Sequence, residues 1–193
     1  MTIGFDFDKV FIDYPPFLPY SLINFLYKGE NVFNKGKTKS QIHYRFPGGL
    51  EQKIRIASHY SIFRNPINEN IKILKKIAER KKEKTYLVSS RFSFLKKRTD
   101  SILNKYNLNQ YFDGIYFNYD NKQPHLFKEQ TIRDLKIDTY IDDDLDLSLY
   151  LAEKMPHLTI FWVRDGRNQT TILPKNVIGI KNLKELYKYH FKK

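Results

Sequence analysis

The chain has 193 residues, of which 41% are hydrophobic and 16% aromatic. That much apolar sequence can bury one core, and it excludes an intrinsically disordered protein. The absence of cysteine excludes disulfide scaffolds, cysteine-ligated metal centres and thiol nucleophiles. The N-terminus lacks the features of a signal peptide, and no apolar run approaches the roughly 20 residues of a membrane span. We therefore expect a soluble, cytoplasmic protein with no membrane partner.

Positive charge is in excess, with 34 Lys and Arg against 21 Asp and Glu, which gives a net charge of +13. Such an excess can serve an anionic partner. However, 25 of these residues are lysine and only 9 are arginine, whereas nucleic-acid faces favour arginine for bidentate contacts. We interpret most of the charge as a solvated surface.

Strands and helices alternate along most of the chain. Short apolar runs predict strands at 2–7, 85–89, 114–118, 139–142, 159–163 and 177–180. Helical periodicity predicts helices at 66–82, about 92–107, about 126–135, about 145–154 and 182–190. In the first of these, we expect Asn65 to be the cap and Pro66 the first helical residue. Strands separated by helices imply right-handed crossovers, so the predicted fold class is α/β, a Rossmann-like, doubly wound parallel sheet.

Residues 14–65 do not follow this alternation. They contain two predicted helices, at about 18–27 and 49–63, joined by polar sequence rich in Gly and Lys. Insertions of this length in compact domains are usually functional. We therefore expect a small helical cap at 14–65, inserted after the first strand of a core formed by 1–13 and 66–193. The tail after about residue 165 carries no motif.

Polar residues stand where the predicted strands end. Asp6 and Asp8 follow the first strand, Ser89 ends the second, and Asp142 and Asp143 end the fourth. In open parallel sheets, ligands bind beyond the carboxyl ends of the strands. Carboxylates gathered there repel one another unless a cation lies between them, and Mg²⁺ prefers oxygen ligands. The pattern predicts a metal-assisted phosphoryl site.

Each of these signals has a structural alternative when it is considered alone. Asp6-Phe7-Asp8 can form a turn, and Ser89 or Asp142–Asp144 can cap a helix. Lys128, which begins the helix before the acidic strand, is one of 25 lysines. Lys122 competes with it for the role of site cation. On the residues alone, the choice between the two lysines stays open.

The order of these motifs resembles that of the haloacid dehalogenase-like (HAD) superfamily of aspartate-nucleophile phosphohydrolases. The segments that carry the resemblance are Ile-Gly-Phe-Asp-Phe-Asp-Lys-Val at 3–10, Tyr-Leu-Val-Ser-Ser-Arg at 86–91, Lys128, and Tyr-Ile-Asp-Asp-Asp at 140–144. The separations of Ser89 from Lys128 and of Lys128 from Asp143 are similar to those of the 5'-nucleotidase-like branch, so the resemblance favours Lys128 over Lys122 as the site cation. Lys9 and Val10 replace the Gly and Thr of many members, and neither change removes a catalytic group.

The resemblance implies a role for each motif residue. Asp6 would be the nucleophile and form an aspartyl-phosphate, and Asp8 would protonate the leaving oxygen and then deprotonate water. Ser89 and Lys128 would bind the phosphate. The expected cofactor is Mg²⁺, with the metal-binding residues Asp6, Asp143, Asp142 and, through its backbone carbonyl, Asp8. The presence of a second acid favours a phosphatase over a dehalogenase.

The predicted cap carries basic and aromatic residues, which suit a small phosphorylated substrate such as a nucleotide monophosphate. Its basic residues are Lys28, Lys35, Lys37, Lys39, Arg45, Lys53, Arg55 and Arg64. Its aromatic residues include Phe17, Tyr20, Phe25, Tyr27, Phe33, Tyr44 and Phe46, of which Phe17, Phe25 and Phe46 are expected to pack the cap onto the core. One alternative is a nucleic-acid end-phosphatase that uses a basic track at 72–82, and another is a non-catalytic binding protein on the same fold. The sequence leaves the oligomeric state open.

Overall fold

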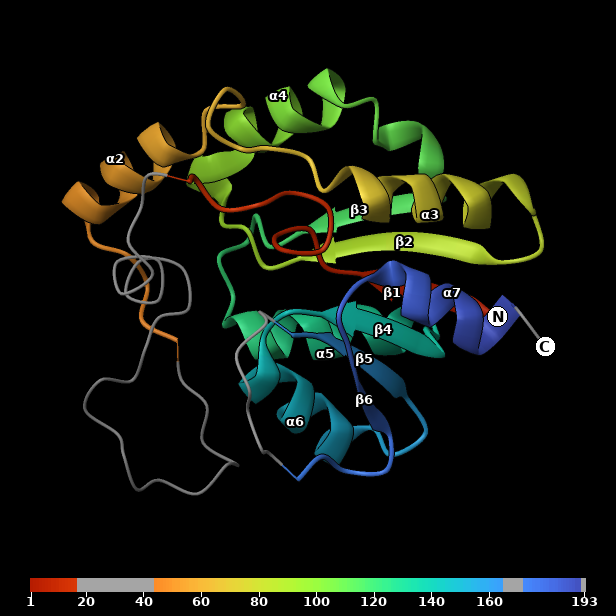
Figure 1. The fold of residues 1–193 in the computed structure, drawn as a ribbon. Helices are drawn as coiled ribbons and strands as arrows, with labels where there is room; N and C mark the ends of the chain where they lie inside the picture. The colour runs from red at the N-terminus through yellow and green to blue at the C-terminus, as the bar shows by residue number, and fades with distance from the viewer. Residues whose placement is uncertain (17–43, 165–171, 192–193) are drawn as a thin grey trace.

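A computed structural model describes residues 1–16, 44–164 and 172–191 of the chain. In this part of the chain, six strands form one sheet in the order β3-β2-β1-β4-β5-β6 (Figure 1). Every neighbouring pair is parallel. The strands are β1 (Thr2–Phe5), β2 (Lys84–Ser89), β3 (Gly114–Phe117), β4 (Thr139–Asp142), β5 (Thr159–Val163) and β6 (Val177–Ile180). The predicted Rossmann-like parallel sheet is confirmed.

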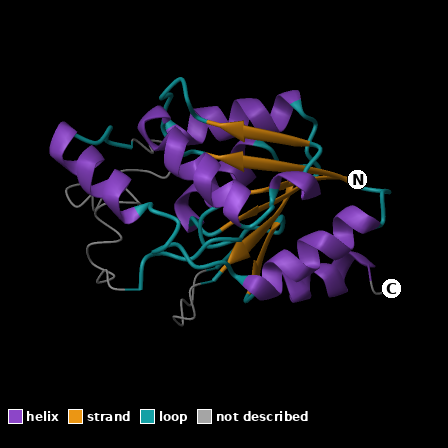
Figure 2. Cartoon of the chain, turned by 90° about the horizontal axis from the view of Figure 1, so that it is seen from above, coloured by secondary structure: helices purple, strands orange, loops and turns teal. Residues whose placement is uncertain are grey.

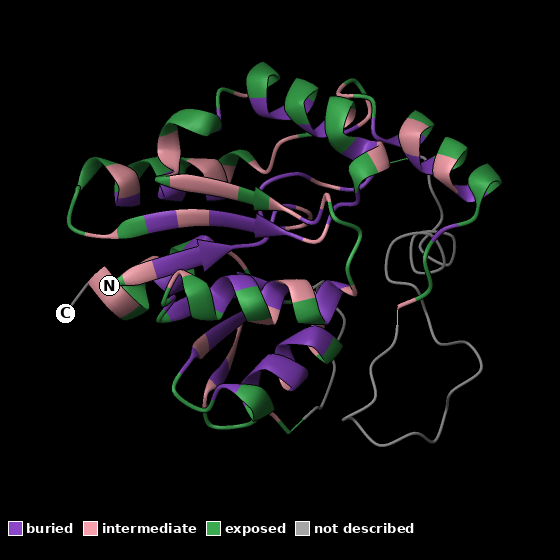
Figure 3. Ribbon diagram, turned by 180° about the vertical axis from the view of Figure 1, so that it is seen from behind, coloured by how far each residue is buried: buried purple, intermediate pink, exposed green. Residues whose placement is uncertain are grey.

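Helices connect these strands and cover both faces of the sheet (Figures 2 and 3). The α-helices are α2 (Gly49–Ser58), α3 (Asn68–Glu79), α4 (Lys96–Lys105), α5 (Pro124–Asp134), α6 (Leu145–Lys154) and α7 (Leu183–Phe191). The described segments also contain two short 3-10 helices, η2 (Ser93–Leu95) and η3 (Asn109–Tyr111). Helix α2 lies beyond the arrowheads of the strands, away from the sheet itself (Figures 1 and 2).

Alternation along the strands explains why helices are needed on both faces. Neighbouring residues of a strand point to opposite faces, and here both faces are apolar. Ile141 packs in a core cluster with residues of α3, α4 and α7. Its neighbour Tyr140 packs in a second cluster with residues of α5 and α6. A sheet that is hydrophobic on both faces must be covered on both, which makes this fold doubly wound.

Several predicted boundaries are confirmed, whereas those near the predicted cap are wrong. The strands at 139–142, 159–163 and 177–180 and the helix at 145–154 have the predicted bounds. The helix predicted at 66–82 begins only at Asn68, because Pro66 pairs with Ile12 in an isolated bridge. The backbone of Ile67 then donates to Phe11 O at 2.7 Å. Long-range pairing thus outweighs the local preference of proline for the first helical position.

Two further helices of the prediction also need comment. The helix predicted at about 92–107 is divided into η2 and α4. The helix predicted at 49–63 ends at Ser58, where α2 stops. The helix predicted at about 18–27 lies outside the described residues. No helix in the described segments is both long and apolar enough to cross a membrane.

The strand order reverses at β1, and this reversal positions the candidate site. From β1 the chain proceeds outward to β2 and β3, and it then returns to place β4 on the other side of β1. Ligands of doubly wound sheets bind at such a switch point, outside the carboxyl ends of the strands. The backbone N–H of Asp6 donates to Ile141 O at 2.8 Å, so the end of β1 is held beside the end of β4.

Candidate active site

Three carboxylates meet at the switch point. Asp6 follows β1, Asp142 ends β4, and Asp143 is the next residue. Each offers one carboxylate oxygen, and these oxygens all lie within 4.8 Å of one another. Asp6 and Asp142 are buried. Oxygen donors at this spacing are the ligand set that a hard divalent cation prefers.

Asp144 has a different role from its two acidic neighbours. Its side chain accepts a hydrogen bond from Leu147 N at 3.1 Å and caps the N-terminus of α6. Its own backbone N–H donates to the Asp142 carboxylate at 2.9 Å. The helix-cap alternative for this acidic run is therefore correct for Asp144, and Asp142 and Asp143 face the cluster.

Lys128 supplies the positive charge of this cluster. It projects from α5, and its Nζ lies 2.8 Å from Asp6 Oδ1 and 2.6 Å from Asp142 Oδ2. Burial alone would lower the pKa of Lys128, but the Asp142 and Asp6 carboxylates hold that pKa well above its usual value. The lysine is therefore charged. Lys122 instead lies on the surface, 3.8 Å from Asp120, and both side chains are mostly exposed.

The surroundings of Asp6 oppose its ionisation. Burial raises its pKa to about 7, and the nearby Asp142 carboxylate adds to that rise while Lys128 opposes it. A carboxyl group in this setting needs positive charge around it to be ionised at neutral pH. The site therefore favours the binding of a further cation.

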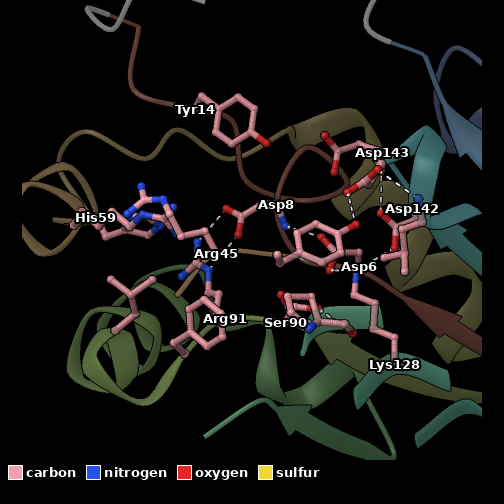
Figure 4. A pocket seen from close by; sticks show the side chains of 18 residues that line it. Asp6, Asp8, Tyr14, Arg45, His59, Ser90, Arg91, Lys128, Asp142 and Asp143 are labelled. Atoms are coloured by element: carbon pink, nitrogen blue, oxygen red, sulfur yellow. Dashed lines mark hydrogen bonds and ion pairs between the residues drawn. The ribbon is translucent and has the colours of Figure 1, made fainter. Parts of the chain in front are cut away.

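Asp8 pairs with Arg91, which lies beside it in the pocket (Figure 4), and with a second arginine, Arg64. Arg91 holds it with two bonds, from Nε to Oδ2 at 2.9 Å and from Nη2 to Oδ1 at 2.8 Å. Arg64 donates to Oδ1 as well. Burial opposes ionisation of Asp8, but the two guanidinium groups outweigh it and hold the pKa of Asp8 well below its usual range. Asp8 is a carboxylate in this structure.

All six residues predicted for the site line a single pocket (Figure 4). They are Asp6, Asp8, Ser89, Lys128, Asp142 and Asp143. The lining is completed by Tyr14, Tyr44, Arg45, Arg55, His59, Ser90, Arg91, Phe92, Leu95, Pro124, Asp144 and Leu147. The structure thus brings together every side chain that the motif order singled out, and their chemical roles remain predictions.

Residues of the predicted cap form one wall of this pocket. The Tyr44 hydroxyl donates to Asp144 Oδ2 at 3.1 Å, and its ring stacks on His125 at 5.9 Å. Its backbone exchanges two hydrogen bonds with the Gln123 side chain, at 2.9 and 3.1 Å. Tyr44, which precedes α2, is therefore bonded to Asp144 after β4 and to Gln123 before α5.

Two basic residues of the predicted cap line the same wall. Arg45 and Arg55 both bond Glu51, the latter at 2.8 Å. The ring of Phe46 lies 5.0 Å from that of Phe92, but Phe46 is 46% exposed, so the predicted packing of the cap onto the core is only partial at this residue. The expected residues Lys28, Lys35, Lys37 and Lys39 lie outside the described part of the chain, as do the aromatic residues from Phe17 to Phe33.

The motif reasoning did not identify Arg91 and Arg64 as partners of Asp8. Arg91 follows Ser89-Ser90 at the end of β2, so its position at a strand end was a usable signal. Arg64 was expected among the basic residues of the cap that serve the substrate. That expectation is wrong, because Arg64 is fully buried, bonds Asp8 and is not among the residues that line the pocket.

Comparisons with known proteins establish the fold. No protein-family model and no curated protein matches the chain. A putative haloacid dehalogenase-like hydrolase from Bacteroides fragilis is similar in structure, with a TM-score of 0.63 at 15% identity over 96% of this chain and 98% of that one. A haloacid dehalogenase-like hydrolase from Streptococcus pneumoniae gives 0.60 at 13% identity over 98% of both chains.

A third similar structure is a chain of the Pnkp1/Rnl/Hen1 RNA repair complex. Its TM-score is 0.51 at 14% identity, and the match covers 86% of this chain but 43% of that one. At such identities the likeness extends to the fold, which is that of HAD-superfamily hydrolases.

Proposed function

We propose that this chain is a Mg²⁺-dependent phosphomonoester hydrolase that works through phosphorylation of Asp6. The observation that carries the proposal is the carboxylate cluster of Asp6, Asp142 and Asp143 beside the buried Lys128, in a pocket at the carboxyl ends of β1 and β4. The HAD-like fold supports the same reaction class.

The residues present fit a Mg²⁺ ion. The side chains of Asp6, Asp142 and Asp143 and the backbone carbonyl of Asp8 would hold it. The three carboxylates repel one another, and Lys128 contacts only Asp6 and Asp142 among them. When bound, the ion would offset the repulsion between an anionic nucleophile and an anionic phosphate.

The chain's own residues account for the remaining steps. A carboxylate oxygen of Asp6 attacks phosphorus, the bond to the leaving oxygen breaks, and water then cleaves the aspartyl-phosphate. Ser89 donates to a phosphoryl oxygen, and Lys128 balances the charge of nucleophile and phosphate. Asp8 transfers the protons. Because Asp8 starts as a carboxylate, it would first take up a proton from solvent and give it to the leaving oxygen. As a carboxylate again, it would accept the proton of the attacking water, which restores the protonated acid.

We propose a small phosphorylated metabolite, such as a nucleotide monophosphate, as the substrate. Tyr44, Arg45 and Arg55 line the pocket on the side of the inserted segment 14–65. An aromatic ring and guanidinium groups suit a ligand that combines an aromatic base with negative charge. The same placement supports residues 14–65 as a cap that shapes substrate choice in the 5'-nucleotidase-like manner.

A nucleic-acid end-phosphatase is the second candidate, and the likeness to a chain of an RNA repair complex favours it. The basic track predicted at 72–82 does not favour that function. Arg80, Lys81 and Lys82 follow the C-terminus of α3 and precede β2, which begins at Lys84. They therefore lie at the amino edge of the sheet, opposite the pocket. Within α3, Lys75 lies 3.8 Å from Glu79.

A panel of phosphomonoesters tests the proposal. Phosphate release would be measured for an aryl phosphate, nucleoside monophosphates, sugar phosphates and 5'- or 3'-phosphorylated oligonucleotides, with Mg²⁺ or with EDTA. We expect Mg²⁺-dependent release and the highest kcat/KM for nucleoside monophosphates. Preference for oligonucleotide ends would favour the second candidate. Release from no substrate would overturn the proposal and leave a non-catalytic binding protein.

A further inference from the structure

Arg64 bonds Asp8 from a fully buried position. It lies between α2 and α3, its side chain is 0% exposed, and its Nη2 donates to Asp8 Oδ1. The pocket lining does not include it. Its backbone carbonyl accepts a hydrogen bond from the Tyr106 hydroxyl at 2.8 Å. The guanidinium also lies 5.4 Å from the centre of the Tyr14 ring. Arg64 is thus held in place by the surrounding core.

Arg91 bonds the same carboxylate, and it differs from Arg64 in its bonds and in its access to the pocket. It forms two bonds to Asp8 and a third, from Nη1 to Thr99 Oγ1 at 3.1 Å. Unlike Arg64, it lines the pocket, so a bound phosphate can contact it directly. Arg64 can therefore act on the reaction only through Asp8, whereas Arg91 can contact both Asp8 and a bound phosphate.

We propose that Arg64 is a positioning residue that holds the carboxylate of Asp8 in the orientation needed for proton transfer, and this inference rests on the proposed function. A carboxylate on a short side chain can rotate, and two guanidinium groups bonded to it restrict that rotation. A misplacement of about 1 Å can lower a rate by about 100-fold. Because Arg64 comes from the segment that follows α2, it also links the predicted cap to the proton-transfer group.

Two other roles for Arg64 predict different behaviour. An arginine that binds the substrate phosphate would raise KM when it is removed, whether or not Asp8 is present. An arginine that only stabilises the fold would lower stability and change the rate equally in both backgrounds. A positioning residue loses its effect on the rate once Asp8 can no longer transfer protons.

The test is a double-mutant cycle on kcat and KM for an aryl phosphate with Mg²⁺. The variants are Arg64→Met, Arg64→Lys and Asp8→Asn, with each Arg64 change also combined with Asp8→Asn. Arg98→Met is the matched control, because Arg98 is another arginine near α2, although it is only partly buried. It donates to Ile56 O at 3.3 Å and lies over the Tyr60 ring, without contacting Asp8. Circular dichroism and thermal melts monitor folding.

We expect Arg64→Met to lower kcat by about 10- to 100-fold, with KM changed by less than about threefold. Arg64→Lys should recover part of the loss, since it keeps the charge. In the Asp8→Asn background, either change should alter kcat by less than about threefold. Arg98→Met should leave kcat near that of the unmodified chain.

Equal losses of kcat in both backgrounds, or a rise in KM alone, would overturn the positioning role. If Arg64→Met fails to fold, the same comparison with Arg64→Lys decides between these outcomes. A wild-type chain that releases no phosphate would overturn the proposed function itself. If the wild-type chain is active but the Arg64 changes affect kcat equally with and without Asp8→Asn, only the role of Arg64 is overturned.

Discussion

Replacing Lys128 by alanine removes the charge that pairs with two buried carboxylates. The Lys128 side chain is 4% exposed, and those of Asp6 and Asp142 are 7% and 1% exposed. Their distances of 2.8 and 2.6 Å from Nζ leave no room for solvent to screen the contact. After Lys128→Ala, Asp6 and Asp142 lose this counter-charge, and the ionised form of Asp6 that attacks phosphorus becomes less favourable. Lys122→Ala, in contrast, removes one member of a pair 3.8 Å apart whose side chains are 57% and 82% exposed.

The magnitudes follow from this difference in burial. Removing one partner of a buried ion pair costs about 3–5 kcal/mol of stability, and an exposed pair contributes about 0–1 kcal/mol. If the transition state of phosphoryl transfer loses the same stabilisation, kcat/KM falls by a factor of roughly 10²–10⁴. We expect that loss for Lys128→Ala and less than about tenfold for Lys122→Ala.

The assay is kcat/KM for one aryl phosphate with Mg²⁺, together with urea unfolding of each variant. Lys128→Met, which keeps much of the side-chain volume, separates the loss of charge from the creation of a cavity. We expect it to be as impaired in turnover as Lys128→Ala. Greater damage from Lys122→Ala would move the role to Lys122, and mild effects from both would refute the assignment of a lysine to this site.

Two further predictions concern stability. Burial holds the pKa of His59 well below 6.5. The His59 imidazole therefore stays neutral in the native state, whereas in the unfolded chain it gains a proton below that pH. This contribution is present above pH 6.5 and is lost progressively as the pH falls below it. His59→Gln should remove that part of the pH dependence in urea unfolding, and an unchanged slope would contradict it. Gly4→Ala should cost about 1–3 kcal/mol, because its Cβ would lie 2.7 Å from Ile137 and 2.8 Å from Tyr140. At Gly179 the Cβ would meet a flexible arginine side chain, so a cost there as large as at Gly4 would refute this packing argument.

The core of the fold could be predicted because its local signals and its tertiary contacts agree. Strand β4 and helix α6 have the predicted bounds, since a short apolar run is followed by acidic residues that cap the helix. The site could be predicted for a related reason. Parallel strands place their carboxyl ends on one edge, so Asp6, Ser89 and Asp142 had to meet once the strand order was known.

The remaining features depend on contacts that no local rule describes. Pro66 pairs with Ile12, far away in sequence, and this pairing delays the start of α3. Arg64 and Asp8 are 56 positions apart, and their meeting depends on how the chain after α2 returns to the core. Charge counting could assign Arg64 to the cap, but it could not reveal that the guanidinium is buried and bonds Asp8.

The rate of phosphate release by the unmodified chain and by Asp6→Asn, each with Mg²⁺ and with EDTA, tests the central claim most directly. Asn keeps the shape of the side chain and removes the nucleophilic carboxylate, so the fold should persist, as circular dichroism can verify. We predict release by the unmodified chain with Mg²⁺, none above background with EDTA, and none from Asp6→Asn in either condition. Release by Asp6→Asn at the wild-type rate, or release that EDTA leaves unchanged, would contradict the account.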